Sequence, residues 1–176
     1  MKSSHKITFF EANEELSQIY DEIEHRVSEA QTNKPIWPCQ KGCDACCRRL
    51  AHVPEVTAVE WQQMQVGIQN LSPAIQAQFL EKISALKNHQ EGFVTCPLLD
   101  EEAGACLIYE HRPAACRMYG FYVSRYNNQW CQDIEDLFQA GELEGVTFGN
   151  FAAMTRHIQE QFGERQSIIA WAESIS

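Results

Sequence analysis

Apolar residues recur at helical spacing in the first part of the chain, between residues 9 and 31. Thr8 and Glu11 have the spacing of a capping box at the start of this pattern. Asn33-Lys34-Pro35 marks its end, because the residue before a proline avoids the helical conformation. The pattern predicts an N-terminal helix over residues of about 8–32.

Start signals predict two more helices after residue 56. Thr57-Ala58-Val59-Glu60 has capping-box spacing and opens a helix that reaches about Asn70. Ser72-Pro73 places a cap residue before a proline at the first helical position, and the apolar stripe that follows is closed by Gly92. We expect these two helices to support the rest of the fold.

The residues after Gly92 have strand character. Phe93–Leu99 and Cys106–Tyr109 are short β-prone runs on either side of a polar turn, which predicts a small hairpin with a long turn. In that hairpin Leu99, and not Cys96, lies nearer to Cys106. The sequence Arg112-Pro113 then predicts the start of a short helix.

The last predicted helices lie within residues of about 132–175. One apolar stripe runs from Phe148 to Phe162 and another from Ile168 to Ile175, with Gly163 as the break between them. Together with the earlier elements they predict a mainly α fold with a small β-hairpin. A chain of 176 residues with 44% hydrophobic and 22% charged residues is suited to one globular domain, residues 1–176.

Charge narrows the classes of partner. The chain carries 14 Lys and Arg against 24 Asp and Glu, a net charge of −10, which opposes attraction to nucleic acid and to anionic membranes. Its N-terminal residues lack the apolar segment of a secretory signal, and no apolar run approaches the length of a membrane span. We therefore expect a cytoplasmic protein without nucleic-acid or membrane partners.

Cysteines give the strongest chemical signal, because four of the eight fall within the nine residues CQKGCDACC. In a reducing compartment such thiols more often mark a metal site than disulfides, although disulfides would become plausible in an oxidising one. All eight lie in a cysteine-cluster region, residues 36–131, around which we expect the helical domain to be organised. The candidate metal ligands are Cys39, Cys43, Cys46, Cys47, Cys96, Cys106, Cys116 and Cys131.

The spacing of Cys43, Cys46 and Cys47 gathers sulfur in either of two ways. On a helix the three thiols share one face, and in an extended loop Cys43-x-x-Cys46 forms a metal knuckle. Cys116 can join such a site only if the loop folds back onto the hairpin. We predict that it does, because the two intervening helices can form an antiparallel pair that returns the chain.

Sulfur-rich sites select Zn²⁺ or iron–sulfur clusters, whereas Mg²⁺ and Ca²⁺ prefer oxygen. Thiolates around a cation leave a negative site, which flanking arginines can neutralise. His52 and His111 lie near cysteines in the sequence, but with eight thiols available they are not taken as ligands. The flanking arginines are Arg48, Arg49, Arg112 and Arg117.

Other chemistries fit the residues less well. Cys43 and Cys46 could cycle between dithiol and disulfide, but the βαβ context of thioredoxin-like proteins is missing. No cysteine stands apart as a nucleophile, and no nucleotide-binding glycine loop is present. An aromatic run with interleaved arginines could stack nucleic-acid bases, but in so acidic a chain we expect it to shield the site from water. Its residues are Arg117, Tyr119, Phe121, Tyr122, Arg125, Tyr126 and Trp130.

The order of these motifs resembles the YkgJ-like cysteine-cluster family of zinc- or iron-chelating domains, over about Cys39 to Cys131. The motifs are Cys39-x-x-x-Cys43-x-x-Cys46-Cys47, Cys96-Pro-Leu-Leu-Asp, Cys106-Leu-Ile-Tyr and Arg112-Pro-x-x-Cys116-Arg-x-Tyr119. The family pattern opens with Cys-x-x-Cys, whereas here three residues separate the first two cysteines. Gly42 can absorb the extra residue by taking a positive φ angle.

The resemblance implies chelation by the cysteines and little about any reaction. We expect a metal-chelating protein that binds zinc or iron, the iron as an ion or as an iron–sulfur cluster. The alternative is an iron–sulfur redox enzyme or electron carrier, and the sequence leaves open whether the protein is an enzyme.

Overall fold

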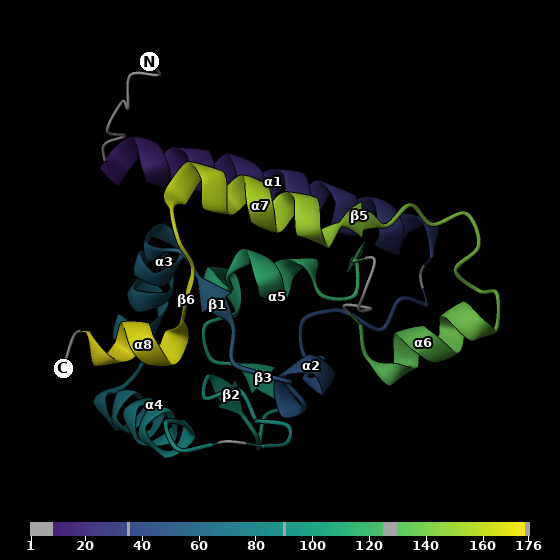
Figure 1. Ribbon diagram of the computed structural model, residues 1–176. Coiled ribbons are helices and arrows are strands. Elements are labelled where there is room, and N and C mark those ends of the chain that lie inside the picture. The colour runs from purple at the N-terminus through teal and green to yellow at the C-terminus, as the bar shows by residue number, and fades with distance from the viewer. Residues whose placement is uncertain (1–8, 35, 90, 125–129, 175–176) are drawn as a thin grey trace.

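The computed structural model describes residues 9–34, 36–89, 91–124 and 130–174, and its regular structure is mainly helical (Figure 1). The described helices are α1 (Phe9–Asn33), α2 (Ala45–Arg48), α3 (Ala58–Gln69), α4 (Pro73–Leu86), α5 (Ala114–Met118), α6 (Gln132–Gln139), α7 (Phe151–Phe162) and α8 (Ile168–Glu173), with a 3₁₀ turn at Tyr109–His111. The short strands are β1 (Glu55–Val56), β2 (Leu99–Asp100), β3 (Ala105–Cys106), β4 (Tyr122–Val123), β5 (Gly149–Asn150) and β6 (Gln166–Ser167).

Helix α1 confirms the predicted N-terminal helix and ends at Asn33, before the proline. It buries Leu16, Ile19 and Ile23 on one face, as the apolar spacing predicts. The capping residue expected at its start, Thr8, lies outside the described residues.

The predicted capping box at the start of α3 is formed. The Thr57 backbone N–H donates to Glu60 Oε2 at 2.9 Å, and the Glu60 N–H donates to Thr57 Oγ1 at 3.5 Å. Helix α4 starts at Pro73, with Ser72 Oγ accepting from the Ile75 N–H. At both predicted helix starts, the capping side chain therefore accepts a hydrogen bond from a backbone N–H of the first turn.

The hairpin is formed in the predicted register, with Leu99 opposite Cys106. Its strands are two residues long, shorter than the β-prone runs that suggested them. Val94 instead makes an isolated antiparallel bridge with Leu50, and the second run ends in the 3₁₀ turn that starts at Tyr109. The first β-prone run therefore pairs with two different segments, Val94 with Leu50 and Leu99 with Cys106.

Two further strand pairs join distant parts of the chain. Antiparallel β1 and β6 pair Glu55 with Ser167, and parallel β4 and β5 pair Tyr122 with Gly149. The Tyr122 ring lies directly against Gly149, where a Cβ atom would overlap it. Pairs of two residues leave no periodic signal in a sequence, so neither was predicted.

The buried apolar residues form two clusters, and Figure 1 shows α3, α4 and α8 gathered at one end of the molecule and α6 at the other. The first cluster joins α3, α4, α8 and the hairpin; the second joins α1, α5, α6 and α7. Cluster one contains Val53, Val56, Trp61, Met64, Phe79, Ile83, Val94, Cys96, Leu98, Leu99, Ile108, Ile168 and Ala172. Cluster two contains Ile19, Ile23, Ala30, Trp37, Ala114, Met118, Phe121, Tyr122, Ile134, Leu143, Met154 and Ile158.

No helix in the described part of the chain combines the length and the apolar character that crossing a membrane requires.

Candidate metal centre

The cysteine-rich loop folds back onto the residues before the hairpin, as predicted. The Cys96 backbone N–H donates to the Cys47 carbonyl at 2.7 Å. Leu50 and Val94 exchange two backbone hydrogen bonds, of 3.0 and 2.9 Å. This short ladder places thiols from two distant segments side by side.

Within the loop, Gly42 has a φ of +95°, so it absorbs the extra residue of the first cysteine spacing in the predicted way. Cys46 and Cys47 then lie on the one-turn helix α2, and their Sγ atoms are 3.9 Å apart. Two thiolates on one tetrahedral Zn²⁺, each about 2.3 Å from the ion, would be separated by about 3.8 Å. The pair therefore has a spacing that suits one cation.

Six thiols line one small cavity of about 50 Å³: Cys43, Cys46, Cys47, Cys96, Cys106 and Cys116. They come from four segments of the chain: helix α2 with the loop just before it, the segment that precedes strand β2, strand β3, and helix α5. A volume of about 10–15 Å³ already accommodates one water, so the cavity has room for a metal ion. The residues present fit a soft cation in both volume and donor chemistry.

The thiols surround this cavity without converging on one point. Among the residues that the structure describes, no group of three or more His, Cys, Asp or Glu side chains already has metal-binding geometry. All eight cysteines are free of disulfides. Coordination would therefore require deprotonation and an inward movement of the sulfurs.

Protonated thiols are favoured in this environment. Burial raises the pKa of Cys106 and Cys116 above the ordinary value. Hydrogen bonding to Cys47, together with burial, raises the pKa of Cys46. For Cys47, hydrogen bonding from Cys46 lowers the pKa, but hydrogen bonding to Cys96 and burial outweigh it and raise the pKa to about 12. A bound cation would reverse this preference, because metal binding displaces the protons.

The remaining thiols form a second group on the side of cluster two. Cys39 and Cys131 pack against that cluster, and the pKa of Cys39 is raised by burial and then by the nearby Cys131 and Cys43 thiols. The negative charge of the Asp133 carboxylate adds a smaller contribution to the raised pKa of Cys39 and Cys43. Asp133 was missed by sequence reasoning, since no fixed spacing connects it to the first cysteines.

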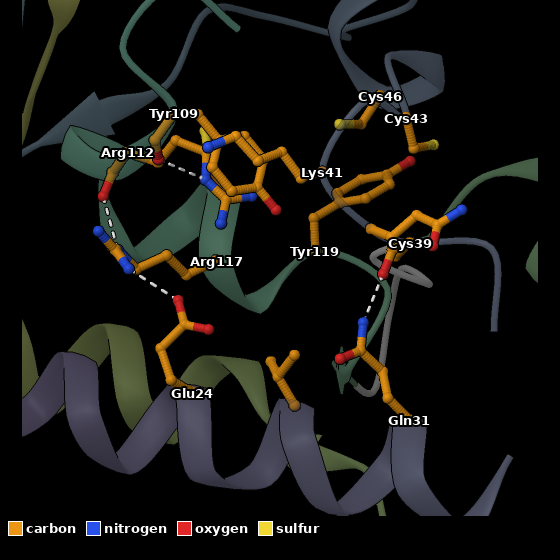
Figure 2. Close-up of a pocket in the computed structure, with 13 residues that line it drawn as sticks. Glu24, Gln31, Cys39, Lys41, Cys43, Cys46, Tyr109, Arg112, Arg117 and Tyr119 are labelled. Atoms are coloured by element: carbon orange, nitrogen blue, oxygen red, sulfur yellow. Dashed lines mark hydrogen bonds and ion pairs between the residues drawn. The ribbon is translucent and has the colours of Figure 1, made fainter. Parts of the chain in front are cut away.

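Gly120 brings Cys39 close to the backbone after α5. A Cβ atom at this position would lie 2.6 Å from Cys39 Sγ and 2.9 Å from Ile134 Cδ1, and the φ angle of +86° also favours glycine. On the other side, the Gln31 side chain of α1 donates to the Cys39 carbonyl at 2.8 Å (Figure 2). The first cysteine is thus fixed by α1 and by the turn after α5.

A cavity of about 250 Å³ adjoins both thiol groups and is shown in Figure 2. Cys39, Cys43, Cys46 and Cys116 contribute to its lining. Tyr119 also borders it, and burial followed by the surrounding thiols raises the pKa of this phenol. Figure 2 shows the Tyr119 ring next to Cys43 at the edge of this cavity.

Of the four arginines expected to offset thiolate charge, Arg112 is the one placed to do so. Its positive charge opposes the rise in the pKa of Cys46, Cys106 and Cys116. The other three have different contacts: Arg48 pairs with Asp44 at 2.6 Å, Arg117 pairs with Glu24 at 2.7 Å, and Arg49 lies over the Phe93 ring at 4.6 Å.

The histidines lie away from the small thiol cavity. The His111 ring packs against Gly67 of α3, and His52 Nδ1 lies 3.1 Å from the Val53 carbonyl oxygen. Neither side chain lines the cavity of six thiols. His52 does line the larger cleft that also contains Cys46 and Cys47.

The described aromatic residues of the predicted shielding run are largely part of the core. Phe121 and Tyr122 are buried, and Phe121 stacks on Trp37 with ring centroids 5.2 Å apart. Trp130 contacts the rings of Phe138 and Phe148. Arg125 and Tyr126 lie outside the described residues.

Glu60 connects the scaffold to the centre in a way that its capping role did not predict. Besides closing the α3 capping box, its Oε1 accepts a 3.0 Å hydrogen bond from the Ala114 N–H. Ala114 is the first residue of α5, the helix that carries Cys116. Glu60 is 2% exposed, so this hydrogen bond connects α3 to the start of α5 within the protein interior.

Comparison with known proteins and protein families gives a match to a family model. No curated protein and no solved structure matches the chain. A family model covers residues 38–134, more than half of the chain, and its description is "putative zinc- or iron-chelating domain". The matched range contains all eight cysteines and agrees with the resemblance seen in the sequence. The chain therefore belongs to the CxxCxxCC family.

Proposed function

We propose that this protein binds zinc or iron through its clustered cysteine thiolates. The observation that carries the proposal is the cavity of about 50 Å³ lined by six thiols from four separate elements. Membership of a family described as zinc- or iron-chelating supports it. The metal would supply the charge that holds these thiolates together, and the chain supplies the donors, the shielding and the positive charge of Arg112.

Within this proposal the thiols divide into two sets. Cys46, Cys47, Cys96, Cys106 and Cys116 form the main set, because they surround one cavity and influence each other's pKa. Cys39, Cys43 and Cys131, with Asp133, form a second set against cluster two. Cys43 borders both cavities and can belong to either set.

An iron–sulfur redox protein is the second candidate. Six thiols line one cavity and four are enough for either one zinc ion or one cluster, so the donor count permits both candidates. Oxygen-protected purification followed by metal and acid-labile sulfide analysis separates the candidates. Zinc without sulfide supports a chelating protein, and iron with comparable sulfide supports a cluster.

Serine substitutions test the ligand sets. Cys46→Ser and Cys116→Ser should remove metal from the main set, while Cys131→Ser should leave that metal bound and affect only the second set. Ala85→Ser, at an exposed position of α4, is the control and should retain the full metal content. The proposal fails if the protected wild-type protein contains neither zinc nor iron, or if Cys46→Ser and Cys116→Ser both keep all of it. A cytoplasmic location remains a prediction.

A further inference from the structure

A cleft of about 830 Å³ lies next to the thiols and is distinct from the cavity of Figure 2. The two cavities share Cys46, Cys116 and Tyr119, which border both. Most of the remaining lining comes from the segment after α2, the segment that precedes strand β2, the first residue of α7, and the residue before strand β6. Its lining includes residues that pack against each hydrophobic cluster, Leu50 against cluster one and Phe151 against cluster two.

Both the size and the lining of this cleft suit a small organic molecule. Pockets of about 300–1,000 Å³ with mainly apolar walls and few polar groups are typical of such sites. Leu50, Phe93 and Phe151 contribute apolar walls. Phe93 is 59% exposed, so its ring offers apolar surface at this cleft.

Its charged groups favour an anion. Arg49 and Arg165 line the cleft, and Glu55 is the carboxylate among its lining residues. This excess of positive charge stands out in a chain with a net charge of −10. A negatively charged molecule would be repelled by most of the surface and attracted here.

Each arginine is held in place yet keeps donors for a ligand. Arg165 Nη2 donates to the Glu55 carbonyl at 2.6 Å, which uses one of its five N–H groups. The Arg49 guanidinium lies 4.6 Å from the centroid of the Phe93 ring. Within the described residues, neither arginine forms an ion pair with a carboxylate. A guanidinium group that is already oriented and has unused N–H donors can bind a carboxylate or phosphate through paired hydrogen bonds.

Thiols form the inner end of the cleft. Cys46, Cys47, Cys96 and Cys116 line it, whereas Arg49 and Glu55 lie at exposed positions nearer to solvent. A bound molecule would therefore extend from the arginines toward the proposed metal centre.

We propose that this cleft binds a small organic anion. Arg49 and Arg165 hold its carboxylate or phosphate group, and its apolar part lies against Phe93 and Phe151. The inner end of the molecule reaches the thiols. That last contact rests on the proposed metal-binding function, whereas recognition of the anion depends on residues that are not ligands.

Isothermal titration calorimetry with three matched probes tests the proposal on the whole 176-residue chain. The probes are 3-phenylpropionate, phenyl phosphate and the neutral 3-phenylpropanol. At least one anionic probe should bind, and the alcohol should bind roughly tenfold more weakly or not at all, since it lacks the charge-assisted hydrogen bonds. Preference for the carboxylate or for the phosphate identifies the natural anionic group, and either preference supports the proposal.

The double variant R49Q/R165Q should weaken binding of the anionic probe by roughly tenfold or more. Arg156→Gln removes a charge at an exposed position of α7, outside the cleft, and should leave binding unchanged. Metal content is measured in the same samples, so the two proposals fail separately: a metal-loaded protein that binds no anion refutes the cleft, and an anion-binding protein without metal refutes the metal centre. Equal binding of the alcohol, or an equal loss in Arg156→Gln, would also overturn the anion site.

Discussion

Replacing Glu60 by glutamine removes the charge of a carboxylate that joins two helices. Its Oε2 accepts hydrogen bonds from the Thr57 N–H at 2.9 Å and from Thr57 Oγ1 at 3.0 Å, and its Oε1 accepts from the Ala114 N–H at 3.0 Å. A glutamine side chain has one acceptor oxygen in place of two. In either amide orientation, an NH₂ group would face a backbone N–H donor in the interior.

The magnitude follows from these three bonds. Hydrogen bonds to a charged group contribute about 1.5–3 kcal/mol each, and a buried donor left without a partner costs about 1–3 kcal/mol. Losing one bond and weakening the other two should lower the free energy of unfolding by about 2–4 kcal/mol. For a chain of this size, that corresponds to a fall of roughly 4–16 °C in Tm.

Urea unfolding in the presence of EDTA measures this loss without a contribution from bound metal. Glu60→Gln should move the midpoint while the slope stays unchanged. Glu81→Gln, at an exposed position of α4, is the matched control and should stay within about 0.5 kcal/mol of the wild type. If Glu60→Gln is as stable as this control, the carboxylate does not anchor α5 and the reasoning is refuted.

Three other predictions concern the thiols and their surroundings. Gly120→Ala should lower the free energy of unfolding by about 2–5 kcal/mol, because it combines an unfavourable positive φ with overlap on Cys39, whereas Gly92→Ala, with φ +90° and open space, should lose only about 1–2 kcal/mol in the same urea titration. Arg112→Gln should weaken zinc binding roughly 10- to 100-fold in a competition with a chromogenic chelator, while Arg156→Gln should not; equal affinities would show that Arg112 does not support the thiolates. In the metal-free protein, the folded-state pKa of Cys47 is raised to about 12, so its contribution to stability is complete below the unfolded pKa and is lost as pH rises toward 12. Urea midpoints measured from pH 8 upward should therefore fall, and a rising midpoint would contradict the assignment.

Local signals explain what could be predicted from the sequence. The Thr57–Glu60 capping box, the Ser72-Pro73 start and the pairing of Leu99 with Cys106 each depend on residues close together in the chain. Gly42 adopts a positive φ within the loop whose extra residue led us to expect it. Such features form wherever the local chemistry permits, so one sequence is enough to identify them.

The arrangement of the site could be predicted only in part, because it depends on contacts between distant segments. The eight thiols were evident, but the proposed division into two sets rests on which cavity each one lines and which thiols influence its pKa. The influence of Asp133 on the pKa of Cys39 and the hydrogen bond from Ala114 to Glu60 join residues that are far apart in the sequence and share no motif. The same holds for the arginines, four of which flank cysteines in the sequence while only Arg112 acts on several thiols in space.

The long helix α1 lies outside the matched family range, yet it holds the helix that carries Cys116. Arg117 pairs with Glu24 and lies 4.3 Å from the centroid of the Tyr20 ring, both on α1. Each hydrophobic cluster also draws on residues beyond the match, Ile168 in one and Ile158 in the other. We therefore expect a recombinant fragment of residues 38–134 to expose apolar surface from both hydrophobic clusters and to aggregate. Grafting the cysteine-containing segment into another protein would therefore require the flanking N- and C-terminal helices as well.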